Sequence, residues 1–167
     1  MPETVIAMLA VTSIGAVWSS CSPDFGVSGV VDRFGQIEPR ILFSSDGYYY
    51  NGKWHDSLSK LAKIREGLPS IEHLVIAPFA ESEIEIDAVQ DSVYWKDFFS
   101  IASDIEFVDL PFNHPIYILY SSGTTGIPKC IVHGAGGTIL QHLKEQRLHV
   151  NLSPDDRFFY FTTCGWM

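Results

Sequence analysis

The stretch from Tyr120 to Lys129 constrains the fold of this chain more than any other part of it. Its sequence is Tyr-Ser-Ser-Gly-Thr-Thr-Gly-Ile-Pro-Lys, and it directly continues the apolar run 115–120, which is typical of a buried strand. Glycine lets backbone N–H groups approach an anion closely, serine and threonine add hydroxyl donors, and lysine adds a positive charge. Pro128 restrains the backbone at the exit, because its ring fixes φ and it carries no N–H. A strand followed by such a loop predicts a polyphosphate site at the end of the strand.

Two common nucleotide-binding patterns do not fit the chain. The Walker pattern requires Gly, four residues and then Gly-Lys-Ser/Thr, whereas Gly123 is followed by Gly126 and no serine or threonine follows Lys129. The Gly-x-Gly-x-x-Gly pattern fails at 134–136, because Ile139 stands where a third glycine is needed. The alternative is an ordinary solvated turn. Five hydroxyl groups, two glycines and a lysine behind a proline favour the phosphate site.

The composition excludes several classes of protein. A chain of 167 residues that is 46% hydrophobic is large enough for one domain with a core. A net charge of −9 without a basic cluster argues against nucleic acid or an anionic membrane as partner. The apolar stretch 5–11, resumed at 14–18, follows no basic residue and is too short to span a bilayer, so it predicts part of the core and no membrane span. The three widely spaced cysteines Cys21, Cys130 and Cys164 predict neither a disulfide nor a zinc site and favour the cytosol.

Helical and strand patterns alternate along the chain, which predicts an α/β fold with a largely parallel sheet flanked by helices. Helices are expected at 2–14, 27–37, 56–68 (with Asp56 as its cap) and 138–150, and strands at 16–19, 40–44, 73–77, 115–120, 129–133 and 157–163. A hairpin with an Asn51-Gly52 turn is expected within 48–54. The acid-rich stretch 81–91 is expected to be a solvated connector, and 93–99 a short helix or turn.

The expected burial and ligand position follow from the same pattern. The helix at 2–14 is expected to be largely buried, and the helix at 138–150 to point Ile139, Leu140 and Leu143 inward. In parallel sheets, ligands bind beyond the carboxyl ends of the strands. The loop 121–129 and the stretch 164–166 follow two such strands, so the two are expected to line a single cleft.

The signature Tyr-x-Ser-Gly-Thr-Thr-Gly-x-Pro-Lys resembles the phosphate loop of the adenylate-forming superfamily, which includes acyl-CoA synthetases, luciferases and peptide-synthetase adenylation domains. The stretches 22–26, 131–138, 141–145 and 162–167 resemble the members that join acetoacetate to coenzyme A. Cys130 departs from the superfamily, which often has glycine after the lysine. Two alternatives stay open: a ligase for another short acid such as acetate or propionate, and a non-catalytic truncated module that binds a nucleotide or a partner.

The resemblance implies a reaction in two steps. A carboxylate attacks the α-phosphate of ATP to give an acyl-adenylate and pyrophosphate, and the thiol of coenzyme A then takes the acyl group. The resemblance therefore implies ATP, Mg²⁺ and coenzyme A as cofactors and small molecules as the partners. The implied phosphate cradle and its lysine are Ser121, Ser122, Gly123, Thr124, Thr125, Gly126 and Lys129.

Individual roles follow from the same resemblance. Lys129 and Thr125 are the implied catalytic residues, and Thr124 or Thr125 would reach the Mg²⁺. Lys53 would meet the nucleotide end of coenzyme A, and Gly165 and Trp166 would form the acyl pocket. His133, on the strand after the loop, is a further catalytic candidate, although a histidine on a strand is also a common packing or surface residue.

The resemblance also bears on domain organisation. Residues 1–167 are expected to be an incomplete part of the large N-terminal AMP-binding domain. The adenine and ribose sites, the hinge and the small C-terminal domain with its lysine would lie outside this stretch. The chain alone is therefore not expected to complete the reaction. The sequence does not indicate an oligomeric state.

Overall fold

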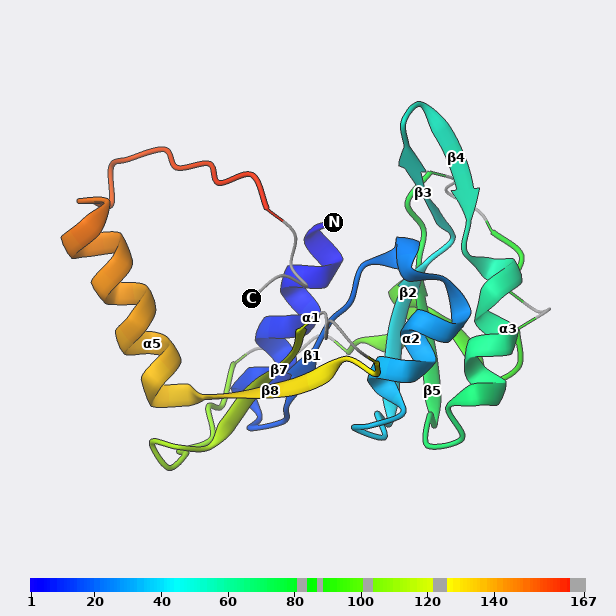
Figure 1. Ribbon diagram of the computed structural model, residues 1–167, viewed down its shortest axis with the longest axis horizontal. Coiled ribbons are helices and arrows are strands. Elements are labelled where there is room, and N and C mark those ends of the chain that lie inside the picture. Colours follow the sequence, from blue (N-terminus) through cyan, green and yellow to red (C-terminus); the bar gives the residue numbers. More distant parts are fainter. Residues whose placement is uncertain (81–83, 87–88, 101–103, 122–125, 163–167) are drawn as a thin grey trace.

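The computed structural model describes residues 1–80, 84–86, 89–100, 104–121 and 126–162, which form a mixed α/β fold (Figure 1). The helices are α1 (Pro2–Ser13), α2 (Gly26–Phe34), α3 (Leu58–Gly67), α4 (Trp95–Phe98) and α5 (Ala135–Lys144), with a 3₁₀ turn η1 (Pro23–Phe25) and a π-helical turn η2 (Glu145–His149). The strands are β1 (Trp18–Ser19), β2 (Ile41–Ser45), β3 (Gly47–Tyr50), β4 (Lys53–Asp56), β5 (His73–Ala77), β6 (Ser92–Tyr94), β7 (Pro115–Ser121) and β8 (Lys129–Gly134).

The strands form two sheets of three and a separate hairpin. One sheet has the order β2-β5-β6 and is parallel throughout. The other has the order β1-β7-β8, in which β1 is parallel and β8 antiparallel to β7. Among the described residues, three strand pairs are parallel and two antiparallel, and both antiparallel pairs join strands that are consecutive in the sequence. The predicted α/β fold with a largely parallel sheet is therefore confirmed.

The core lies around β5. Leu74, Val75 and Ile76 are completely inaccessible to solvent, as expected for a parallel strand that is covered on both faces. Helices α2 and α3 pack against each other beside this sheet and contribute Phe34 and Ile64 to the same core (Figure 1). The apolar residues that predict these two helices are therefore buried or partly buried in the structure.

Local sequence signals position several boundaries correctly. Asp56 caps α3, because its carboxylate accepts hydrogen bonds of 3.1 Å from the backbone N–H groups of Leu58 and Ser59. The hairpin β3-β4 turns at Asn51 and Gly52, whose φ angles of 48° and 71° are those of the tight turn expected for Asn-Gly. The predicted helix cap and hairpin are confirmed.

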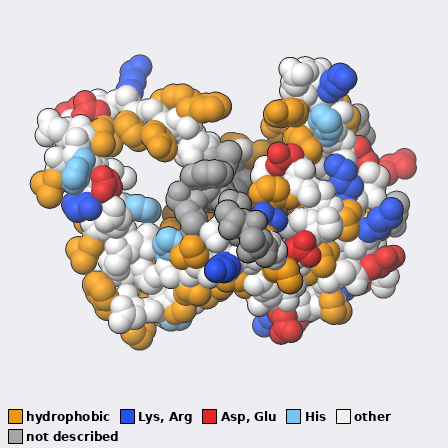
Figure 2. Space-filling view, viewed as in Figure 1, with side chains coloured by type: hydrophobic (Ala, Val, Ile, Leu, Met, Phe, Trp, Pro, Cys, Tyr) orange, Lys and Arg blue, Asp and Glu red, His pale blue; other side chains and the backbone are white. Residues whose placement is uncertain are grey.

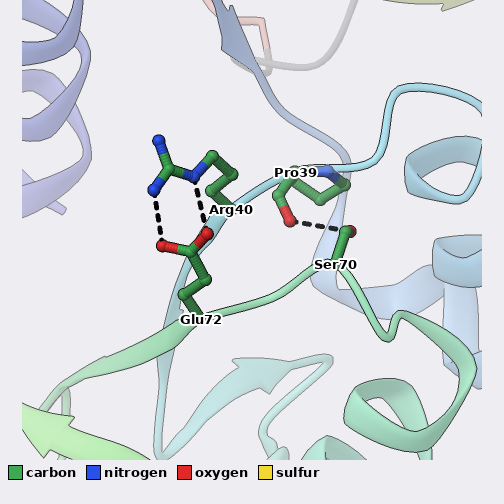
Figure 3. A network of polar contacts seen from close by, with 4 residues as sticks. All are labelled: Pro39, Arg40, Ser70 and Glu72. Carbon is green, nitrogen blue, oxygen red and sulfur yellow. Dashed lines mark hydrogen bonds and ion pairs between the residues drawn. The ribbon is translucent and has the colours of Figure 1, made fainter.

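Two tethers fix the chain between α2 and β2 (Figure 3). The Ser70 hydroxyl donates a 2.9 Å hydrogen bond to the carbonyl of Pro39. Arg40 forms a paired hydrogen bond with Glu72, at 2.8 and 2.7 Å. Both contacts join the entry of β2 to the entry of β5, next to the point where these parallel strands begin to pair.

The expected burial of the first and last helices is wrong. In α1 only Ala7 is buried, and the side chains of Ile6 and Leu9 are more than half exposed. In α5 the side chains predicted to point inward are also half exposed or more: Ile139, Leu140 and Leu143. Figure 2 shows hydrophobic side chains on the outer surface along this part of the molecule. Apolar periodicity identifies a helix correctly, but burial requires a facing surface, which the described residues do not supply here.

The acid-rich stretch differs from the expected solvated connector. Ile84, Ile86 and Val89 are buried and belong to the core, so these three side chains pack in the protein interior rather than lying in solvent. The next residues, expected as a helix or turn, begin with the short strand β6, which extends the parallel sheet, before the single turn α4.

Three further expectations about boundaries are wrong. Helix α2 ends at Phe34, before the expected Ile37. Helix α5 begins at Ala135, before the expected Thr138, so that Gly136 and Gly137 lie in its first turn. The segment 157–162 forms no strand, although it is rich in β-prone aromatic residues, and Phe159 and Phe161 are 83% and 91% exposed. Intrinsic preference for a strand is expressed only where a partner strand is available.

Candidate phosphate-binding site

The predicted phosphate loop connects two antiparallel strands. Ser121, the last residue of β7, pairs with Lys129, the first residue of β8. Gly126 has a φ of +138°, which side-chain-bearing residues rarely adopt, and no atom lies within 4 Å of a Cβ built there, so the backbone conformation rather than lack of space favours glycine. Lys129 is exposed at the start of its strand. The predicted cradle residues Ser122, Gly123, Thr124 and Thr125 lie outside the described residues.

Tyr120 attaches β7, the strand that leads into the loop, to neighbouring elements. Its ring is buried and packs 6.2 Å from the ring of Phe34 in α2. Its hydroxyl lies 3.1 Å from the hydroxyl of Ser19 in β1, and the Ser19 hydroxyl also donates a 2.6 Å hydrogen bond to the carbonyl of Ile118. Burial raises the pKa of Tyr120 to about 12. The tyrosine is therefore a neutral structural group at neutral pH, and it ties β7 to α2 and β1.

His133 lies further along β8, opposite Tyr117. His133 lies four positions from Lys129, about 13 Å along the strand, so the two side chains project from well-separated points of β8. The Nε2 atom of His133 is buried and has no hydrogen-bond partner among the described residues. A cavity of about 350 Å³ lies beside it, between β8 and α5, and is lined also by Thr138 and His142. A buried polar atom without a partner next to a polar cavity is a position where a ligand could bind.

The remaining predicted site residues are not brought together by the described structure. Lys53 is exposed at the start of β4, on a hairpin that belongs to neither three-stranded sheet. Figure 1 shows this hairpin projecting away from the sheet that contains β7 and β8. Gly165 and Trp166 lie outside the described residues, as does Cys164. A single cleft between this last stretch and the phosphate loop therefore stays a prediction.

The described residues test the predicted metal and thiol chemistry in part. No group of three or more His, Cys, Asp or Glu side chains within the described ranges converges on a possible metal position. The predicted Mg²⁺ ligands Thr124 and Thr125 lie outside the described residues. Cys21 and Cys130 are free thiols, and burial raises the pKa of Cys21 to about 11. No helix in the described part of the chain is long and apolar enough to cross a membrane.

Two residues near the loop were not identified from the sequence. Ser19 supports Tyr120, and the side chain of Gln36 contacts the backbone of Pro128. Both act across about a hundred positions of sequence, and no local pattern marks a long-range hydrogen bond. Only the tertiary structure could identify them.

Comparison with known proteins agrees with this geometry. The family model described as AMP-binding enzyme matches residues 1–167. The chain belongs to the AMP-binding enzyme family. It is 52% identical to an acetoacetyl-CoA synthetase of Gallus gallus over 99% of its own length, and 55% identical to an acetoacetyl-coenzyme A synthetase of Rhizobium meliloti (strain 1021) over 100% of it. A solved structure, acetoacetyl-CoA synthetase from Streptomyces lividans, superposes with a TM-score of 0.91 at 42% identity.

The chain matches only a portion of each of these proteins. The superposition includes 99% of this chain but only 25% of the Streptomyces lividans chain. The chain spans 26% of the length of each of the two curated relatives. The fold therefore matches part of an acetoacetyl-CoA synthetase, and the superfamily predicted from the phosphate-loop signature is confirmed.

Proposed function

We propose that residues 1–167 are the phosphate-binding part of an ATP-dependent ligase that joins acetoacetate to coenzyme A. The observation that carries the proposal is the phosphate-loop signature between β7 and β8, in a chain similar along its whole length to acetoacetyl-CoA synthetases. Those relatives are longer, so the proposal includes the remainder of the AMP-binding domain and a small C-terminal domain outside this stretch. The proposed compartment is the cytosol.

The chemistry of the first step accounts for the residues of the loop. Negative charge accumulates on pyrophosphate as it leaves the α-phosphate, and preorganised donors stabilise that charge. Lys129 lies exposed at the strand end and is free to reach a phosphate group, while the loop supplies N–H groups and hydroxyls. Mg²⁺ would neutralise further phosphate charge, with Thr124 and Thr125 as its proposed ligands.

The other proposed roles belong to residues outside the phosphate loop. His133 is proposed as an active-site residue because its buried nitrogen has no partner among the described residues and lies beside a cavity. Its distance along β8 from Lys129 favours a contact with a part of the substrate other than the leaving pyrophosphate. Lys53 is proposed to meet coenzyme A, and Gly165 and Trp166 to line the acyl pocket.

The test is exchange of labelled pyrophosphate into ATP by the full-length protein, with acetoacetate, acetate and propionate as acids. We expect exchange that prefers acetoacetate. Lys129→Ala should lower kcat/KM about 10²- to 10³-fold, the usual cost of removing one donor to a developing anion, and Thr125→Ala should also lower it. The matched control is Lys63→Ala, which removes an exposed lysine from α3 and should have no effect.

Each outcome separates the candidate functions. Preference for acetate or propionate would keep the ligase and change the acid. Absence of exchange with all three acids, from a folded full-length protein, would refute the ligase and favour a binding module.

A further inference from the structure

The last turn of α2 contacts both strands that frame the phosphate loop. Phe34 packs on Tyr120 at the end of β7, as described above. Two residues later, Gln36 continues the helical turn, with its backbone N–H bonded to the carbonyl of Arg33 at 3.2 Å. The backbone of Gln36 is therefore held by the helix, and its side chain reaches toward the other strand, β8.

All hydrogen-bonding atoms of the Gln36 amide are engaged. Its Nε2 donates to the carbonyl of Asp32 at 2.7 Å and to the carbonyl of Pro128 at 2.9 Å. Its Oε1 accepts from the thiol of Cys130 at 3.5 Å. A primary amide has two N–H protons and one carbonyl oxygen, so both protons of this side chain and its oxygen take part in hydrogen bonds. It joins the end of α2 to both neighbours of Lys129.

These contacts connect Gln36 to the two residues that flank Lys129. Pro128 has a fixed φ and lacks an N–H, so its carbonyl is the group through which its backbone can be held. Since α2 is anchored in the core through Val30 and Phe34, the amide of Gln36 relates the loop exit to the core. A displacement of about 1 Å at a catalytic group is enough to lower a rate about a hundredfold.

We propose that Gln36 is a positioning residue, which holds the exit of the phosphate loop so that Lys129 meets the leaving pyrophosphate; this rests on the proposed function. The contact with Cys130 uses the position at which this chain departs from the glycine common in the superfamily. Gln36 is exposed, so its removal leaves the carbonyls of Asp32 and Pro128 open to water. Its loss should therefore shift the loop without unfolding the domain.

The experiment uses the full-length protein with Gln36→Met, which keeps the length of the side chain and removes its hydrogen bonds. Gln36→Glu removes both donors and keeps an acceptor. The matched control is Ser70→Ala, which removes another side-chain bond to a proline carbonyl in the connection after α2, at Pro39 and away from the loop (Figure 3). Two quantities are measured: pyrophosphate exchange kinetics, and amide hydrogen exchange over residues 127–132.

Both Gln36 variants should lower kcat about tenfold or more, while KM for the acid changes less than about twofold, because the pyrophosphate end of the reaction is displaced and the acid site is not. Amide exchange over 127–132 should rise about fivefold, as expected for loss of one net hydrogen bond. Ser70→Ala should change neither quantity.

Three results would overturn the inference. Unchanged amide exchange over 127–132 would show that Gln36 does not hold this strand, whatever the kinetics. Faster exchange with an unchanged kcat would show a contact without a catalytic consequence. A wild-type protein without pyrophosphate exchange would refute the proposed function, and this inference with it. The wild-type measurement alone distinguishes this failure from a failure of the role of Gln36.

Discussion

The hydroxyl pair beneath the phosphate loop gives a sharp prediction, because its two members should not be equivalent. Ser19 donates its only proton to the carbonyl of Ile118 at 2.6 Å, so the bond of 3.1 Å between the two hydroxyls takes its proton from Tyr120. Tyr120→Phe removes this second bond and leaves Ser19 with its carbonyl partner. Ser19→Ala removes both bonds and leaves the Tyr120 hydroxyl without its partner.

The magnitudes follow from this geometry. Tyr120→Phe should lower the free energy of unfolding by about 0.5–1.5 kcal/mol, the net value of one hydrogen bond when no polar group is left unpaired. Ser19→Ala should cost about 1–3 kcal/mol, because the hydroxyl of Tyr120, a residue that is only 8% exposed, loses its partner. The double variant Ser19→Ala with Tyr120→Phe should recover part of the Ser19→Ala loss, since it removes the unpaired hydroxyl.

The assay is urea unfolding of the protein and its three variants, followed by tryptophan fluorescence and analysed as a double-mutant cycle. The reasoning would be refuted if Tyr120→Phe cost as much as Ser19→Ala, or if the double variant were less stable than Ser19→Ala. Either result would mean that the proton of the pair is placed differently.

Two further predictions concern the core and a buried thiol. Leu74→Ala in β5 should cost about 2–5 kcal/mol in the same urea assay, because the side chain is completely buried between neighbouring strands and leaves a cavity; a cost below 1 kcal/mol would contradict the central position of this strand. Burial raises the pKa of Cys21 from 9.0 to about 11, so iodoacetamide at pH 8.5 should alkylate it slowly in the native protein and readily in urea. Because the folded pKa lies above the unfolded one, the stability that this thiol contributes is present below pH 9 and should be lost, by on the order of 2 kcal/mol, as the pH rises from 9 to 11. Cys21→Ala should lose less stability over that range, and an equal loss would contradict the assignment.

The sequence alone predicted the features that depend on neighbouring residues. The cap of α3, the Asn-Gly hairpin, the strand before the phosphate loop and the strand after it all follow from residues within a few positions of one another. The superfamily followed in the same way, because the phosphate-loop signature is a continuous stretch. Such features are encoded by local backbone preference and local hydrogen bonding, which a linear sequence displays directly.

Only the tertiary structure decided which of these elements are buried and which distant residues meet. The aromatic segment 157–162 has strong strand preference yet forms no strand, while the acid-rich segment supplies buried Ile84 and Ile86. The bond from Gln36 to Pro128 joins residues 92 positions apart. Burial and long-range pairing depend on the surface that another part of the chain presents, so they cannot be deduced from a short stretch of sequence. The interaction exists only after the fold has brought the two partners together.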